Sequence, residues 1–513
     1  MGEIKNFNNF CLLTLITIFF LLSPLVNSYQ INKENTDGFF DINFDCSKTG
    51  NIINPYSEIN CGPLPLENVK NAVNIKQEYQ EIGINYIRTH DLDNSIFPCD
   101  ISTIFPNQDA DPALESNYDF SISDNYVTSI INAGSKVFYR LGESAGGPNN
   151  PPLDFDKWAE ICKHITMHYN DGWKDGFHYN IEYWEIWNEP DLKGFWNGTA
   201  DQYYKLYEAA SNTLKQYNSS LNIGGPCTSS VYNENFTTRF LDYVVNNSIA
   251  LDFYSWHMYA DSPSDLSFAS KLIRGYLDSY GLVDCENINT EWNINILTPQ
   301  RDKDNAKNAA FTSSCLNAFQ DSYLDKAFRY RGNQDNNWLA RLIGFDLSLF
   351  SYDGIYKKPA LSYLAMHYMV KDTPIRIKSE EMQGDNQITY IAGISEDKSN
   401  ITVIISNFES ENSNCNLVIS NLPWSSNYKA VHYLIDEDND LKISKINESF
   451  GNRYSKEITI KKTSVHFIRL TNSDVLPSEG PKTADIPLIL QLKFLDPFTR
   501  ILGILIFLLI FDV

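Results

Sequence analysis

The sequence divides into two regions that differ in the spacing of their apolar residues. Between about Tyr29 and Met369, short β-rich apolar runs alternate with longer amphipathic stretches. Such alternation is typical of repeated βα units around a parallel sheet. After Met369 the chain carries short alternating strands without long helices. The pattern predicts a (β/α)8 barrel over residues 29–370 and a smaller all-β sandwich over residues 371–472.

Seven apolar runs in the first region are expected to be strands: Ile84–Arg88, Lys136–Leu141, Tyr183–Trp187, Leu221–Gly225, Leu251–His257, Asn287–Glu291 and Ala327–Arg331. Four amphipathic segments are expected to be helices: Leu66–Glu81, Phe155–Tyr169, Ala200–Lys215 and Ser264–Ser279. The later strands recur at intervals close to those of a TIM barrel. A doubly wound sheet has similar intervals, so spacing alone leaves closure of the barrel open.

The second region predicts strands at Gln387–Ile394, Asn400–Phe408, Cys415–Leu422, Tyr428–Asp436 and Tyr454–Leu470. Phe39–Phe44, far upstream, is a candidate additional strand for this sandwich. These segments are short and alternating, as in antiparallel sheets with one buried face.

The two ends of the chain have the pattern of processing signals. Lys5 precedes the apolar run Cys11–Leu22, and small residues follow up to Ser28, so residues 1–28 are expected to be a cleaved signal peptide. An uncleaved anchor is the alternative, although the run is short for a bilayer.

The other end, residues 473–513, combines a polar spacer with a short apolar tail, Ile501–Phe511. That tail is too short for a good transmembrane helix and fits a GPI-anchor signal better. An interfacial or disordered tail is the alternative. We therefore expect a secreted or cell-surface protein that contacts the membrane only through a lipid anchor, with a lysosomal or endosomal location as a second option.

Secretion has consequences for cysteines and asparagines. Eight cysteines follow the signal region, and some are expected to form disulfides: Cys46, Cys61, Cys99, Cys162, Cys227, Cys285, Cys315 and Cys415. Six sequons become usable glycosylation sites on the surface: Asn197, Asn218, Asn235, Asn246, Asn400 and Asn447.

Charge and composition limit the classes of molecule that this protein is expected to bind. The formal net charge of −23 argues against nucleic acid, which requires clustered Lys and Arg. The aromatic content of 13% suits stacking on sugar rings, although most aromatics fill cores. No cysteine pair has the spacing of a thiolate clamp, so we predict no metal site.

The strongest chemical signal is the run Tyr183-Trp-Glu-Ile-Trp-Asn-Glu-Pro-Asp191. It is an apolar strand that ends in Asn188 and Glu189, and barrel enzymes place their chemistry at such strand ends. Burial of Glu189 against Trp184 or Trp187 would favour the protonated form that a general acid needs. Glu185 is a competing carboxylate deeper in the strand.

A second carboxylate, Glu291, ends another apolar strand in the run Asn289-Thr-Glu-Trp-Asn293. It follows Glu189 by about 100 positions, or three βα units of roughly 31 residues, which places the two across the barrel mouth. That arrangement allows the roughly 5 to 5.5 Å between carboxyl groups that a retaining glycosidase requires. Two glutamates supply all the chemistry of such an enzyme, so no cofactor is expected.

Several motifs together resemble glycoside hydrolase family 39, which contains β-xylosidases and α-L-iduronidases. They are Trp-Asn-Glu-Pro at 187–190, Phe195-Trp196, Gly-Gly-Pro at 224–226, the run 252–257, Thr290-Glu291, the run 86–90 and the run 354–359. The likeness covers essentially the whole barrel. Asn-Glu-Pro alone is shared across the clan, whereas the ordered set is much more specific.

The resemblance implies that Glu189 is the acid/base and Glu291 the nucleophile. It also implies sugar contacts or positioning roles for further residues: Arg88 beside the nucleophile, His90 and His257 in the subsite, Asn188 on the 2-hydroxyl, Tyr259 on the nucleophile, and Asp335 facing substrate. His257 could equally be a satisfied structural residue. Trp292 either stacks on the sugar or packs in the core.

Departures from the family pattern bear on the substrate. Tyr259 and Gly344 stand where the iduronidase branch has cations for a uronate carboxylate, which favours a neutral sugar. Arg140 replaces an acidic position of the xylosidase branch and could meet an acid group. We therefore expect a retaining, β-xylosidase-like hydrolase of oligo- or polysaccharides. The alternatives are an iduronidase-like hydrolase of uronic-acid glycans and a non-catalytic carbohydrate-binding surface protein.

Overall fold

The computed structural model describes residues 40–65, 73–90, 97–144, 147–333, 344–379, 387–411 and 413–472. The predicted signal peptide, the predicted anchor tail and Asp335 lie outside these residues. Within the described ranges, no helix is both long and apolar enough to cross a bilayer.

Eight parallel strands close into a barrel, which confirms the predicted fold and excludes the open sheet. They are β2 (Glu58–Asn60), β3 (Tyr86–Arg88), β4 (Lys136–Leu141), β5 (Tyr183–Ile186), β6 (Asn222–Thr228), β7 (Phe253–Ala260), β8 (Glu286–Ile294) and β9 (Lys326–Arg329). Pairing of β9 with β2 closes the ring. Seven strands lie where the apolar runs predicted them, whereas β2 was missed.

A helix follows each barrel strand in the described part of the chain. These are α2 (Lys76–Glu81), α4 (Ser121–Asn132), α5 (Phe155–Asp171), α6 (Ala200–Tyr217), α7 (Glu234–Asn246), α8 (Pro263–Ser279), α10 (Ala306–Phe319) and α12 (Lys358–Asp372). Shorter elements lie in the loops: α3 (Ile101–Ile104), η1 (Glu115–Asn117) and α9 (Gln300–Asp304). Local sequence fixes several ends, since Thr199 and Gln202 form a capping box on α6 and Gly172 ends α5 in the left-handed conformation.

The smaller domain is one mostly antiparallel sheet of nine strands in the order β15-β14-β17-β12-β11-β10-β1-β13-β16. Its strands are β1 (Phe40–Ile52), β10 (Ile375–Ser379), β11 (Ile388–Ile394), β12 (Asn400–Asn407), β13 (Ser413–Ser420), β14 (Asn427–Ile435), β15 (Asp440–Phe450), β16 (Tyr454–Ile460) and β17 (Ser464–Thr471). Tyr428 of β14 and Ile458 of β16, which lie near opposite ends of the strand order, share one apolar core. The sheet therefore curls over on itself.

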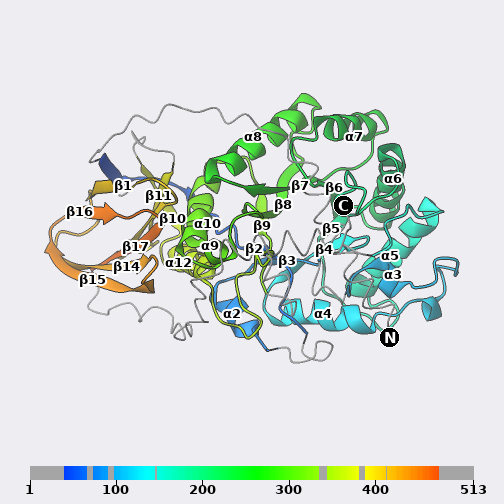
Figure 1. Ribbon diagram of the computed structural model, residues 1–513, viewed down its shortest axis with the longest axis horizontal. Helices are drawn as coiled ribbons and strands as arrows, with labels where there is room; N and C mark the ends of the chain where they lie inside the picture. Colours follow the sequence, from blue (N-terminus) through cyan, green and yellow to red (C-terminus); the bar gives the residue numbers. More distant parts are fainter. Residues whose placement is uncertain are drawn as a thin grey trace, which may run out of the picture.

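Strand β1 precedes the barrel in sequence but belongs to the smaller domain, as expected for the Phe39–Phe44 segment. It pairs antiparallel with β10 and parallel with β13. In Figure 1 this blue strand lies among the yellow and orange strands of the C-terminal half. The other face of the sheet packs on α10 and α12, where Phe311 meets Phe408 and Lys358 donates to the Asp436 carbonyl oxygen.

The prediction of disulfides is wrong for the described residues, among which no two cysteines form one. All eight cysteines are buried, and they are spread over different parts of the molecule. Cys162 and Cys315 pack in the layer between barrel and helices, and Cys415 lies in the core of the smaller domain. The side chains of these three cysteines fill space as small apolar groups. The six sequon asparagines are all at least partly exposed.

Candidate active site

The inside of the barrel changes character along its axis. At the amino-terminal end of the strands, an apolar layer fills the interior: Tyr86, Phe138, Tyr183, Phe253, Ile288 and Phe328. Because side chains alternate along a strand, the next inward positions are two residues further on. On β3, β4 and β5 these are Arg88, Arg140 and Glu185, all buried. The layer of side chains directly above this apolar layer, which we call the barrel plug, is therefore charged.

A bulge in β8 brings Glu291 to the inner face. Trp256 pairs with Asn289 and His257 with Glu291, so Thr290 is an extra residue in β8. Without it, alternation from Ile288 would place Glu291 on the outer face, since a shift of one residue reverses every side chain. Trp292 consequently points outward, where its ring packs against Phe319 of α10. The structure favours packing over sugar stacking for Trp292.

The segment after β5 holds Glu189 in an unusual backbone conformation. Trp187 and Glu189 have positive φ angles of 74° and 47°. Such angles are costly for residues other than glycine and are concentrated at functional sites. The Glu189 amide donates to the Cys227 carbonyl oxygen at 2.9 Å, which anchors the turn to β6. Trp187 packs edge-on against Trp196 and donates to the Phe195 carbonyl oxygen, so its ring belongs to the outer layer.

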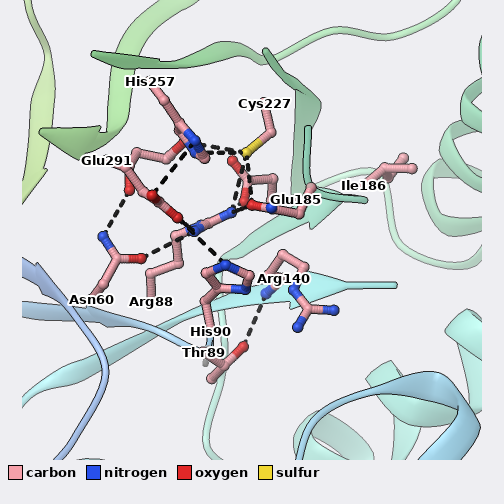
Figure 2. A network of polar contacts seen from close by, with 12 residues as sticks. Asn60, Arg88, Thr89, His90, Arg140, Glu185, Ile186, Cys227, His257 and Glu291 are labelled. Atoms are coloured by element: carbon pink, nitrogen blue, oxygen red, sulfur yellow. Dashed lines mark hydrogen bonds and ion pairs between the residues drawn. The ribbon is translucent and has the colours of Figure 1, made fainter. Parts of the chain in front are cut away.

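Arg88 connects the carboxylates and the polar groups around them (Figure 2). Its Nε donates to Glu185 at 2.7 Å, Nη1 to Asn60 and Glu291 at 3.0 Å, and Nη2 to Asn188 at 2.7 Å. Burial opposes its charge, but Glu185, Cys227 and Glu291 raise the pKa of Arg88 above its usual range. The guanidinium is a fixed positive charge beneath Glu291.

Glu291 is surrounded by groups that stabilise its ionised form. Tyr259 donates to Oε2 at 2.8 Å, and Arg88 donates to Oε1. His90 Nε2 lies 3.5 Å from the same Oε1. Burial raises the pKa of Glu291 above its ordinary value, and Arg88 and Tyr259 offset part of that rise. These partners keep Glu291 the more acidic of the two facing carboxyl groups.

Glu189 has a different environment. Burial, and to a lesser extent Asp191, raises the pKa of Glu189 to about 8, with Arg88 opposing. Its Oε1 lies 2.8 Å from His257 Nδ1, and Oε2 forms no hydrogen bond to any described residue. One oxygen of Glu189, one oxygen of Glu291 and a nitrogen of His257 all lie within 4.8 Å of one another. The site thus pairs a carboxyl group whose pKa is raised to about 8 with one that Arg88 and Tyr259 bind directly.

The spacing of Glu189, His257 and Glu291 would also fit the ligands of a metal ion. In this structure their atoms already bond one another, Tyr259 and Arg88. A guanidinium 3.0 Å from Glu291 disfavours a second cation at the same place. We therefore assign no metal to these residues.

Arg140, a departure from the family pattern, lies inside the barrel beside Glu185. Its Nη2 donates to Asp100 and to the Ser144 hydroxyl, both at 2.7 Å. Asp100 also accepts from the Ser144 amide, so this counter-ion is fixed in place. The charge of Arg140 is thereby balanced within the protein, which weakens the case that it receives an acid group.

Gly344, another position where the sequence departs from the family pattern, lies beside the cation of Lys303. Its carbonyl oxygen accepts from Lys303 Nζ, which also donates to the Ile296 carbonyl oxygen. Burial lowers the pKa of Lys303 to about 8. This lysine ties the loops after β8 and β9 together.

Eight of the nine predicted site residues are described, and the structure brings seven of them together, whereas Trp292 faces outward. It adds Asn60, which donates to the Thr290 carbonyl oxygen at the bulge, and Cys227, whose Sγ contacts Arg88 and His257. Asn60 lies on a strand that had no apolar pattern. Cys227 directly follows the Gly-Gly-Pro motif, and the sequence alone indicates only a disulfide for it.

Comparison with known families is consistent with this geometry. The model of "Glycosyl hydrolases family 39" matches residues 41–331, which is more than half of the chain. The chain belongs to glycosyl hydrolase family 39. The match begins in β1 and ends just after β9, so the family region includes every barrel strand.

Two curated relatives are similar in sequence. A β-xylosidase from Caldicellulosiruptor saccharolyticus is 30% identical over 212 residues, covering 38% of this chain and 40% of the relative. A β-xylosidase from Geobacillus stearothermophilus is 25% identical over 293 residues, covering 50% of this chain and 55% of the relative. The alignments thus span about half the length of these relatives.

Solved structures share the fold over most of the chain. A glucosidase from Croceicoccus marinus has a TM-score of 0.73 at 24% identity, covering 85% of this chain and 100% of that one. A β-xylosidase from Caulobacter crescentus gives 0.66 at 16% identity, covering 84% and 99%. A bacterial orthologue of human α-L-iduronidase gives 0.65 at 13% identity, covering 85% and 84%. The shared fold therefore extends beyond the barrel into the C-terminal β domain.

Proposed function

We propose that this family 39 protein is a retaining β-glycosidase that acts on xylosides, with Glu189 as acid/base and Glu291 as nucleophile. The observation that carries the proposal is that one oxygen of Glu189 lies within 4.8 Å of one oxygen of Glu291 across the barrel mouth. The pKa of Glu189 is raised to about 8, and Glu291 is held by Arg88 and Tyr259. Retaining enzymes separate these groups by about 5 to 5.5 Å, whereas inverting enzymes need roughly 6.5 to 9.5 Å for a water molecule.

The geometry supports a double displacement. In the first step, Glu189 gives its proton to the glycosidic oxygen while a Glu291 oxygen attacks the anomeric carbon and the aglycone leaves. In the second, Glu189 removes a proton from water, which attacks the same carbon and releases Glu291. Two inversions at one carbon give net retention.

Asn188 supports sugar binding next to the reacting carbon. Its Oδ1 accepts from Arg88, but its buried Nδ2 has no partner among the described residues. A buried amide donor without a partner is costly, so a ligand hydroxyl is the expected acceptor. We assign this acceptor to the sugar 2-hydroxyl, with His90 lining the same subsite.

The charge of the subsite favours a neutral sugar over a uronate. Tyr259 is engaged with Glu291, Arg140 with Asp100, and Lys303 with backbone carbonyl oxygens. A uronate carboxylate would need a donor set of its own to offset its desolvation. Assays on 4-nitrophenyl β-xyloside and on an iduronide with the same aglycone decide this, and faster iduronide cleavage would contradict a xyloside substrate.

The nucleophile is tested by Glu291→Gly. This variant should hydrolyse aryl β-xylosides at least about 10⁴-fold more slowly, because the covalent route is lost. Azide should restore turnover and give a glycosyl azide of inverted configuration. Absence of azide rescue would remove Glu291 from this role.

Glu286→Gly is the matched control, because Glu286 lies on the same strand at the opposite end of the barrel, where it pairs with Lys326. It should keep its activity and show no response to azide. If the wild-type protein binds glycans across a panel without cleaving any, the non-catalytic alternative is correct.

We also propose that the protein is secreted and glycosylated, because signal-peptide features precede two domains whose six sequon asparagines are all at least partly exposed. Protein from a eukaryotic host should migrate faster in denaturing gel electrophoresis after treatment with a peptide N-glycosidase. Unchanged mobility would contradict this part of the proposal.

A further inference from the structure

Cys227 occupies a position in the site that the proposed reaction does not yet use. A bulge in β6 between Pro226 and Thr228 and a positive φ of 58° turn its side chain into the barrel. Its Sγ lies 3.1 Å from Arg88 Nη2, 3.0 Å from His257 Nε2 and 3.4 Å from Asn188 Oδ1. Figure 2 shows the sulfur beside both His257 and the Arg88 guanidinium.

The direction of these hydrogen bonds follows from the chemistry of each group. Arginine can only donate, so Cys227 Sγ accepts from Arg88. The thiol proton is then free to point at His257 Nε2, at Asn188 Oδ1 or at Thr290 Oγ1, which lies 3.6 Å away. Asn188 Oδ1 already accepts from Arg88 at 2.7 Å, and both oxygens are more distant from Sγ than His257 Nε2 is. The thiol therefore donates to His257 Nε2.

This assignment fixes the tautomer of His257. Burial lowers the pKa of His257 to about 4, so the ring is neutral and carries one proton. If Nε2 accepts from the thiol, the proton is on Nδ1, 2.8 Å from Glu189 Oε1. Nδ1 then donates to Oε1, and the acid proton of Glu189 must be on Oε2.

We propose that Cys227 is a positioning residue that holds His257 in the Nδ1–H tautomer and so directs the acid proton of Glu189 onto Oε2, toward the glycosidic oxygen. The donors form one chain, Arg88 to Cys227 to His257 to Glu189. In the opposite tautomer, Nδ1 would accept the proton of Glu189 and hold it away from the leaving group. This inference rests on the proposed role of Glu189.

The test compares leaving groups, because a misdirected acid proton harms only substrates that need protonation. Cys227→Ala should lower kcat/KM for phenyl β-xyloside about 10- to 100-fold, which is a part of the roughly 10²–10⁴-fold that general acid catalysis contributes. The change for 2,4-dinitrophenyl β-xyloside should be less than about threefold, since that aglycone leaves without a proton. Cys227→Ser, which keeps a donor and acceptor, should recover most of the lost rate.

Cys162→Ala is the matched control, because Cys162 is an equally buried thiol in α5 within the layer outside the barrel. It should lose similar packing without any dependence on the leaving group. Equal losses for both substrates in Cys227→Ala, or no loss for either, would overturn the proposal.

A second measurement does not depend on turnover. The ¹⁵N shifts of the His257 ring should report a protonated Nδ1 in the wild type and a change of tautomer in Cys227→Ala. A wild-type ring protonated at Nε2 would overturn the inference about Cys227. Failure of the wild type to cleave any glycoside would instead overturn the proposed function and leave the ring measurement to decide the tautomer.

Discussion

The two ends of the barrel interior are built by the same strands and have opposite chemistry. The amino-terminal end is filled by aromatic and aliphatic side chains, with Phe138 packed 4.6 Å from Phe328 between ring centroids. The carboxyl-terminal end holds Arg88, Glu185, Glu189, His257 and Glu291, all buried. The difference teaches that one end supplies stability, while the other keeps charges in place at a cost in stability.

The largest effect is expected for Arg88→Met, which removes the positive charge that binds both Glu185 and Glu291. Glu185 and Glu291 would be left buried without their cation, and breaking such a pair costs about 3–5 kcal/mol of stability. We also expect kcat/KM to fall by roughly 10³-fold or more, since Arg88 fixes the nucleophile. Urea unfolding and steady-state kinetics measure both.

Arg376→Met is its control, because Arg376 pairs with Asp321 at the surface of the molecule. Exposed pairs contribute only about 0–1 kcal/mol. Unfolding midpoints that coincide for the two variants would contradict a special role for Arg88.

The second prediction concerns the apolar end. Phe138→Ala should cost about 3–5 kcal/mol, because it leaves a cavity in the barrel plug. The kcat of the molecules that stay folded should change less than about twofold. Phe450, which is 74% exposed on β15, provides the control Phe450→Ala with little change in either quantity. A loss of kcat in Phe138→Ala would show that the two ends are coupled.

The third prediction is the pH dependence of the charged end. Glu189 must hold its proton in the first step, and its pKa is raised to about 8. Activity should therefore be present below this value and fall about tenfold per pH unit above it. Glu189→Gln should lose this alkaline limb when assayed with 2,4-dinitrophenyl β-xyloside. An alkaline limb that persists in Glu189→Gln would assign it to another group.

The smallest effect is expected for Tyr259→Phe, which removes one hydrogen bond to Glu291 Oε2. Hydrogen bonds to charged groups contribute about 1.5–3 kcal/mol, so kcat/KM should fall about 10- to 100-fold. Tyr203→Phe removes an equally buried hydroxyl, bonded to the Ile186 carbonyl oxygen in the outer layer. It should leave kcat/KM unchanged, and an equal loss in both variants would point to a general effect of lost hydroxyls.

Much of the fold could be predicted because most barrel strands contain a short run of buried apolar residues. The exception, β2, has only Glu58-Ile59-Asn60, and two of its three residues are polar because they serve the interior. Strand β15 was missed for the opposite reason, since it is an edge strand with mostly exposed side chains. Pattern recognition fails where a strand is too short or too exposed to bury an apolar stripe.

The site could be predicted only where a residue belongs to a motif. Glu189 and Glu291 end apolar strands beside tryptophans, and the structure places both in the mouth, three strands apart. The bulges at Thr290 and Cys227 cannot be read from residue types, yet they decide which side chains face inward. For this reason the outward position of Trp292 and the contacts of Cys227 emerge only from the structure.

The pairing of β1 with β13 sets an order of events during synthesis. Phe40 pairs with Cys415, so this strand leaves the ribosome long before its partner exists. At roughly 5–20 residues per second, the wait is on the order of tens of seconds. The barrel can close in that interval, whereas the β domain is completed only when the last third of the chain returns to its beginning. We expect neither domain to be separable by a single cut in the chain.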